Sequence, residues 1–278
     1  MKEPDLLESS ISEPEAEYAR RFGGISRLYG KQGVVRIIDA HICVIGIGGV
    51  GSWVVESLAR SGVGAITMID MDIVATSNIN RQILAVSDTI GKDKTIVMCD
   101  RIREINPDCN VTMVDDFISR DNLAELILPS YDFIVDCIDN FRVKAGLINF
   151  CKQQQIKILT VGGAGGQTDP SKVRQTDLNR TQHDVLLATT RKQLRQKYGY
   201  TRNLKKDFSV PCVYSDEQLV YPDGAGGLSS QKPSADTSDE SNFSALSCAG
   251  GIGSISHVTA TFAMFAAAYV LNEIVNAD

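Results

Sequence analysis

Polar side chains that could bind a triphosphate are concentrated in one stretch of the chain, and a single carboxylate follows further on. Arginine and lysine neutralise phosphate charge, asparagine can orient a phosphate oxygen or a metal-bound water, and a carboxylate can hold Mg²⁺ between phosphate oxygens. The residues are Asn78, Asn80, Arg81, Gln82, Lys94 and Asp139. Any one of them alone is typical of a solvated loop or a helix cap, but the set indicates nucleotide chemistry.

A glycine-rich stretch, GIGGVG at residues 46–51, precedes this set. It fits the dinucleotide fingerprint, with Gly46, Gly48 and Gly51 at its three positions and Gly49 between them. Asp70 follows Gly51 by nineteen residues, where an acid can bind a ribose hydroxyl. These features alone favour a nicotinamide dinucleotide. A dehydrogenase has no evident use for the polar set between residues 78 and 94, however, so the complete pattern favours ATP.

Short apolar runs and amphipathic segments alternate around these residues. We expect strands at 41–47, 65–70, 110–116, 132–139 and 156–163, with helices at 52–62, 93–106, 121–128 and 143–155. Valine- and isoleucine-rich strands separated by helices predict a Rossmann-like α/β fold, with a mostly parallel, doubly wound sheet and an antiparallel extension. In such a sheet, ligands bind at the carboxyl ends of the strands, where Asp139 is expected.

The chain is predicted to form a single ATP-binding domain over residues 20–278, after an acidic, flexible segment at 1–19. Its core covers about 20–170. A basic segment and a mobile loop follow at about 180–245, and an apolar C-terminal helix at about 250–275. That helix has an unbroken apolar run only over 262–271, whereas a membrane span needs about 20 residues. A core or dimer helix is therefore favoured over a membrane span.

Composition narrows the class of protein further. The net charge is −6, so any nucleic-acid binding must use a local basic patch. Seven scattered cysteines without a C-x-x-C pair indicate a reducing compartment and no zinc site. The N-terminus has neither a secretory signal nor an arginine-rich transit pattern, so a cytoplasmic location is expected.

GIGGVG, the D-x-D of Asp70 and Asp72, SNINRQ, GKDK and DCIDN together resemble the ubiquitin-activating-type adenylyltransferases over about residues 20–170. The resemblance implies that ATP adenylates a carboxylate, with Mg²⁺ as cofactor. By motif position it implies the following roles: Asp70 binds the ribose; Asn78, Arg81 and Lys94 bind the phosphates; Asp139 binds Mg²⁺; and Gln82 gives a supporting contact. Arg81, Lys94 and Asp139 are the implied catalytic residues.

Longer segments, including RFGGISRLYG, VGGAGGQTDP and SCAGGIGSISHVTATF, extend a resemblance to the bacterial tRNA threonylcarbamoyladenosine dehydratases over about residues 20–272. This family implies adenylation of the threonylcarbamoyl carboxylate beside the anticodon, ring closure and net loss of water. It also implies a homodimer, tRNA as partner, and a cysteine at the position of Cys248 that could accept sulfur from a cysteine desulfurase or form a thioester. Cys212 is a second candidate nucleophile.

Three other interpretations stay open. An adenylyltransferase for a small sulfur-carrier protein is one, although such enzymes commonly carry zinc cysteine pairs. Such enzymes also commonly carry an arginine that reaches the ATP of the partner subunit. This chain has Gly24 at that position, and Arg27 could take the role of the missing arginine. A non-catalytic scaffold and a nicotinamide oxidoreductase are the others.

The basic segment contains seven lysines or arginines and no acid between residues 185 and 206. Phosphate neutralisation by such cations, with an aromatic ring stacked on a splayed base, would suit an anticodon loop. We expect tRNA contact from Arg191, Lys192, Arg195, Lys197 and Tyr198; the alternative is a solvated helix face. His183 and His257 are expected to be structural.

Overall fold

The computed structural model describes residues 13–223, 225–231 and 252–277. Its main sheet has seven strands in the order β3-β2-β1-β4-β5-β7-β6, and only β6 runs antiparallel to its neighbour. The strands are β1 His41–Ile45, β2 Ala65–Ile69, β3 Asn110–Val114, β4 Phe133–Asp136, β5 Ile158–Val161, β6 Val173–Asp177 and β7 Pro211–Ser215. A separate small hairpin pairs β8, Tyr221–Pro222, with β9, Leu228–Ser229.

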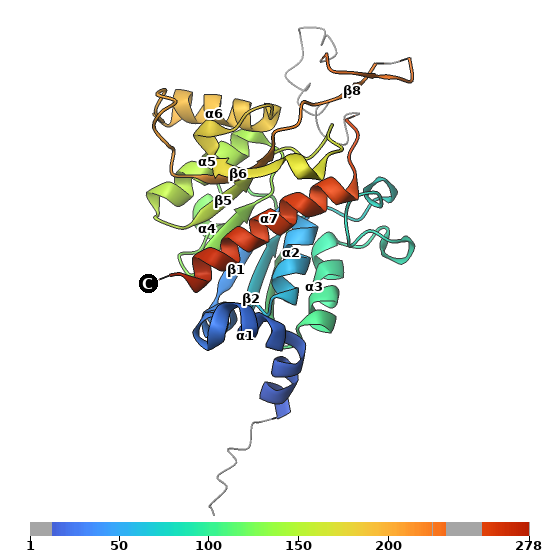
Figure 1. The fold of residues 1–278 in the computed structure, drawn as a ribbon, viewed down its shortest axis with the longest axis vertical. Helices are drawn as coiled ribbons and strands as arrows, with labels where there is room; N and C mark the ends of the chain where they lie inside the picture. Colours follow the sequence, from blue (N-terminus) through green and yellow to red (C-terminus); the bar gives the residue numbers. More distant parts are fainter. Residues whose placement is uncertain (1–12, 224, 232–251, 278) are drawn as a thin grey trace, which may run out of the picture.

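Helices cover both faces of this sheet (Figure 1). One face carries α1 Glu13–Asp39, α2 Gly51–Arg60, α3 Lys94–Ile105 and the C-terminal α7 Ser256–Val275. The other carries α4 Leu123–Leu126, α5 Phe141–Gln153 and α6 Val185–Lys197. Four 3₁₀ turns lie in the connections, at Thr76–Asn78, Ser87–Thr89, Pro170–Lys172 and Leu178–Arg180.

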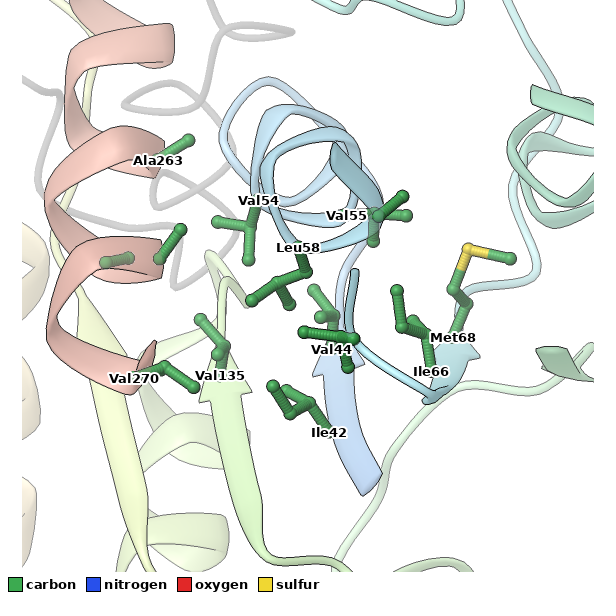
Figure 2. Packing of buried hydrophobic residues seen from close by; sticks show 14 of the residues in the cluster. Ile42, Val44, Val54, Val55, Leu58, Ile66, Met68, Val135, Ala263 and Val270 are labelled. Atoms are coloured by element: carbon green, nitrogen blue, oxygen red, sulfur yellow. The ribbon is translucent and has the colours of Figure 1, made fainter. Parts of the chain in front are cut away.

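The larger part of the core lies between β1, β4, α2 and α7. Ile42 and Val44 of β1 contact Leu58 of α2, and Ala263 and Val270 of α7 close the same cluster (Figure 2). Strands buried on both faces need apolar side chains at successive positions, which explains the continuous valine and isoleucine runs. This packing fixes the carboxyl ends of the central strands, from which the polar residues extend.

The five expected strands and the four expected helices are present, and the doubly wound sheet with an antiparallel extension is confirmed. Several boundaries differ from the prediction, among them the following three. Residues 13–19 belong to α1 rather than to a flexible segment, α4 is a single turn, and β4 ends at Asp136, so Asp139 lies in the loop before α5. Boundaries shift because contacts between elements, rather than local pattern, decide where the ends fray.

The C-terminal helix α7 begins at Ser256 and has a buried face that includes Val258, Phe262, Ala266 and Val270. Within the described residues, α7 is long and apolar enough to cross a membrane, but half of it is buried inside the fold. It is therefore a core helix in this structure. Cys248 and residues 232–245 of the expected mobile loop lie outside the described residues.

Candidate functional site

A cavity of about 740 Å³ opens at the carboxyl ends of the central strands. The structure gathers nine of the residues predicted to bind ATP or Mg²⁺ in its wall: Gly46, Gly48, Gly49, Asp70, Asn78, Arg81, Gln82, Lys94 and Asp139. Gly51 and Asn80 are the exceptions: Gly51 begins α2 beneath the loop, and Asn80 donates from Nδ2 to the carbonyl oxygen of Ser254 at 2.7 Å instead of lining the cavity. Residues from five separate segments thus line one space.

Two positions of the glycine loop require glycine because neighbouring backbone atoms lie very close to them. Gly46 has φ +86°, and a Cβ there would lie 3.0 Å from the carbonyl oxygen of Cys137. A Cβ on Gly51 would lie only 1.8 Å from the carbonyl oxygen of Gly46. Neither position can accept a larger residue without moving the backbone, and the turn therefore leaves space for a ligand against the start of α2.

Asp70 is held in place at the end of β2 by two backbone amides. Its Oδ2 accepts a hydrogen bond from Ile47 N at 2.5 Å, and its Oδ1 accepts one from Asp72 N at 2.8 Å. Burial raises the pKa of Asp70, and nearby Lys94 opposes that rise. A fixed, nearly buried carboxylate beside the glycine loop is suited to binding a ribose hydroxyl.

Asn78 and Arg81 lie in the connection after β2, which short-range hydrogen bonds shape. Asn78 Oδ1 accepts from Ala75 N at 3.0 Å, and Arg81 Nη1 donates to Ser77 O at 2.7 Å. The carbonyl oxygen of Arg81 accepts hydrogen bonds from Trp53 Nε1 at 3.0 Å and Thr259 Oγ1 at 3.2 Å. The connection is therefore anchored to both α2 and α7.

Two further polar residues extend from this side of the cavity. Lys94, the first residue of α3, is buried and forms an ion pair with Asp72 at 2.7 Å. Gln82 is also buried, and its Oε1 finds no hydrogen-bond partner among the described residues. A buried acceptor without a partner is costly, so a ligand that donates to it would be favoured.

Asp139 is exposed at the rim of the cavity, in the loop that follows β4. The described ranges contain no group of three or more His, Cys, Asp or Glu side chains placed to hold a metal ion. A single carboxylate is nevertheless compatible with Mg²⁺, which commonly uses one or two carboxylates and completes its shell with phosphate oxygens and water. The donor set fits a metal that arrives with a triphosphate.

The sequence pattern missed a second wall of the cavity, formed after β5 and at the start of α6. It includes Gly162–Gly165 and Asp184–Leu186, joined by Leu219 and Ile252. Asp184 is buried; its Oδ2 accepts from Gly163 N at 2.9 Å and its Oδ1 from Leu187 N at 2.8 Å. Burial raises the pKa of this carboxyl. The glycine run VGGAGG after a predicted strand was the available signal.

A buried ion pair joins α5 to β4. Lys144 Nζ is 2.8 Å from Asp136 Oδ2, and both side chains are completely buried. Thr160 Oγ1 of β5 donates to the same carboxylate oxygen at 2.7 Å and accepts from Lys144 at 3.1 Å. The three residues join the adjacent strands β4 and β5 to α5.

Cysteines in the described part of the chain are poor nucleophiles. Cys212 is completely buried in β7, and burial raises the pKa of its thiol well above the usual value. Cys137 lines the cavity, but burial raises its pKa to about 12. A covalent role for Cys212 would require a thiolate that this environment disfavours.

The predicted tRNA patch divides into two kinds of cation. Arg191 donates to Thr181 Oγ1, and Arg195 donates to Asn179 Oδ1 at 2.5 Å and stands over the Phe208 ring. Lys192 and Lys197 are exposed, whereas Tyr198 is half-buried. The arginines on α6 therefore serve internal contacts, and the lysines remain open to solvent.

Three other predicted residues lie elsewhere. Arg27 is on α1, with its guanidinium beside Gly23 and Gly24, and does not line the cavity. His257 Nε2 lies 3.0 Å from the carbonyl oxygen of Thr168, and His183 lies 4.0 Å from Asp216. Neither histidine lines the cavity.

Known proteins are similar to this chain in both sequence and fold. A model described as the ThiF family matches residues 18–277. tRNA threonylcarbamoyladenosine dehydratase of Haemophilus influenzae is 47% identical over 257 residues, which cover 92% of this chain and 94% of that protein. The Escherichia coli protein of the same name is 46% identical over 256 residues, with the same shares covered. A solved structure of the E. coli protein in complex with ATP has a TM-score of 0.81 at 44% identity, and the match covers 95% of this chain and 96% of that one.

Proposed function

The chain belongs to the ThiF family, and on this premise we propose that it is an ATP-dependent dehydratase of threonylcarbamoyladenosine in tRNA. The supporting observation is that relatives carrying this name match 92% of the chain, and that the family model extends over residues 18–277, which include the wall after β5 and helix α7. A similarity restricted to the nucleotide-binding half of the chain would not have indicated which carboxylate is adenylated.

ATP would occupy the side of the cavity built by the glycine loop. Asp70 would bind a ribose hydroxyl, and Asn78, Arg81 and Lys94 would bind the phosphates; all four line the cavity. Gln82 would accept a hydrogen bond through its unpartnered Oε1. The solved structure of the E. coli relative in complex with ATP supports ATP as the ligand of this cavity.

Asp139 would hold Mg²⁺ at the rim of the cavity. The metal would neutralise charge on the phosphate oxygens, which favours departure of pyrophosphate. Arg81 and Lys94 would supply the remaining positive charge, held in position by the fold before ATP arrives.

The chemistry requires activation because a carboxylate is a poor electrophile. A carboxylate oxygen of the threonylcarbamoyl group attacks the α-phosphorus of ATP, and the bond from that phosphorus to pyrophosphate breaks. A nucleophilic atom of the same substituent then attacks the acyl carbon, the bond to AMP breaks, and a proton is lost. Because both reacting groups belong to one substituent, proximity supplies a large effective molarity, and no protein nucleophile is needed.

The tRNA would approach along α6. This helix starts in the cavity wall at Val185, and its exposed Lys197 lies about 18 Å further along at 1.5 Å per residue. Lys192 of α6 is also exposed, as are Arg202, Lys205 and Lys206 in the connection between α6 and β7. We use the name α6 basic surface for these five cations. They would bind phosphates around the anticodon loop, while Arg191 and Arg195 hold the segment in shape.

The direct test is mass spectrometry of nucleosides from tRNA that carries threonylcarbamoyladenosine, after incubation with the protein and Mg-ATP. Loss of one water from that nucleoside, dependent on ATP and abolished in Asp139→Ala, is the expected result. Asp132→Asn, an exposed carboxylate before β4, is the matched control. If ATP binds but the nucleoside keeps its mass, the dehydratase proposal fails and activation of a carrier protein becomes the better explanation.

A further inference from the structure

One wall of the cavity contains none of the residues assigned to ATP. It consists of the backbone of Gly162–Gly165 and the first turn of α6, with Val185 and Leu186. Attack on the α-phosphorus must come from the side opposite the departing pyrophosphate, since phosphoryl and adenylyl transfers proceed roughly in line. A substrate carboxylate therefore needs a seat across the cavity from the phosphate-binding residues.

Gly162 and Gly163 differ in what the fold requires of them. A Cβ on Gly162 would lie 2.1 Å from Asp184 Oδ2, so the fold itself demands glycine there. A Cβ on Gly163 would meet only Leu186 Cβ at 3.9 Å, and the φ of Gly163 lies outside the left-handed region. The fold would accept alanine at 163, and the open space beside Gly163 is available to a ligand.

The position of Gly163 is fixed on both sides of its backbone. Its amide donates to buried Asp184 Oδ2 at 2.9 Å, and its carbonyl accepts from Gln167 Nε2 at 3.2 Å. Asp184 also caps α6 through Leu187 N. One carboxylate therefore joins the glycine wall to α6, which carries Lys192 and Lys197 of the α6 basic surface.

We propose that this wall seats the modified nucleoside, with Gly163 against the threonylcarbamoyl substituent and Asp184 as the positioning residue that holds the wall to α6. The proposal rests on the proposed function, because the nucleoside is the acid being activated. Val185, Leu186, Leu219 and Ile252 give the wall an apolar lining that suits a purine and the threonyl methyl group.

Gly163→Ala tests the seat directly, because it adds one methyl group to the wall. Its melting temperature and its Kd for ATP should equal those of the unmodified protein, and its KM for modified tRNA should rise about 10-fold or more. Gly23→Ala on α1, whose Cβ would meet only Arg27 at 4.0 Å, is the matched control and should leave KM unchanged.

Asp184→Asn tests the positioning role. Asparagine can still cap α6 with its oxygen, but its amide nitrogen cannot accept from Gly163 N. We expect a raised KM for tRNA with an unchanged Kd for ATP. Asp177→Asn is matched to it, since Asp177 also caps a turn and accepts from Val210 N at 3.0 Å, and should change stability alone.

The outcomes are distinct. If the unmodified protein fails to dehydrate the nucleoside, both the proposed function and the proposal that the wall binds this nucleoside are wrong. If it does so but Gly163→Ala keeps the same KM and kcat, only the seat is overturned. If Gly163→Ala weakens ATP binding as much as it raises the KM for tRNA, the wall binds ATP, and the proposal that it seats the nucleoside is also overturned.

Discussion

Lys94 Nζ lies 2.7 Å from Asp72 Oδ2, and this ion pair joins the start of α3 to the loop after β2. The two partners differ sharply in exposure: the lysine side chain is 6% exposed and the aspartate side chain 55% exposed. The backbone repeats the link, because Lys94 N donates to Asp72 O at 3.1 Å. The lysine is thus held in the cavity wall before any phosphate binds, which limits the entropy lost on binding.

Replacement of this lysine should affect ATP more than AMP. We expect Lys94→Met to weaken ATP binding about 10-fold or more, since a charge-assisted contact to phosphate is worth about 1.5–3 kcal/mol. AMP lacks the β- and γ-phosphates and should lose less. Calorimetric titration with both nucleotides measures the difference, and an equal loss for both would show that Lys94 does not contact the outer phosphates.

The α6 basic surface should bind tRNA through its lysines. Lys192→Glu combined with Lys197→Glu should weaken tRNA binding and reduce its salt dependence while leaving the melting temperature unchanged, because both side chains are exposed. Filter binding at several salt concentrations measures both quantities. An unchanged affinity in the double variant would remove this surface from the proposal.

Arg195→Gln should lower the stability of the protein rather than its affinity for tRNA. This change removes the donors to Asn179 Oδ1 and Thr201 O and the contact with the Phe208 ring. Stability should fall by about 1–3 kcal/mol, as is usual when a partly buried hydrogen-bonded charge is lost. Urea unfolding measures the loss. A stable variant with weakened tRNA binding would show that Arg195 acts at the surface after all.

The buried ion pair between Lys144 and Asp136 should contribute to stability. Lys144→Met leaves the Asp136 carboxylate buried without its cation, and such a change costs about 3–5 kcal/mol. Removing both charges with Lys144→Met and Asp136→Leu should cost less than the single change. Urea unfolding of the three variants measures this coupling, and additive losses would contradict it.

Buried thiols and phenols should make the protein sensitive to alkali. Burial raises the pKa of Cys109 and Cys151 from 9.0 to about 12, and it raises that of Tyr200 from 10.0 to about 12. An acid whose folded pKa is raised contributes stability that is complete below its unfolded pKa and is lost as pH rises toward the folded one. The free energy of unfolding should therefore decline from about pH 9 upward. Urea titrations at pH 8 and pH 10.5 check this, and equal stability at both would contradict it.

The sequence predicted the strands and helices, and it predicted that the glycine loop and the polar residues after it meet at one edge of the sheet, because both are encoded locally. GIGGVG follows an apolar strand, and SNINRQ and GKDK flank short turns whose hydrogen bonds, such as Asn78 Oδ1 to Ala75 N, span only a few residues. Parallel strands then bring their carboxyl ends to one edge, so Asp70 and Asp139 meet the same cavity without further information.

The tertiary structure alone decided the roles of residues whose partners are distant in sequence. From the sequence, Asp184 is an ordinary helix cap. The structure shows that it also accepts a hydrogen bond from Gly163 N, twenty-one residues earlier in the chain. Arg195 reads as a free cation until Asn179 and Phe208 fold around it. Periodicity and motif spacing report the backbone path and the nearest neighbours, whereas burial and hydrogen bonding between distant segments determine which charges remain available to a ligand.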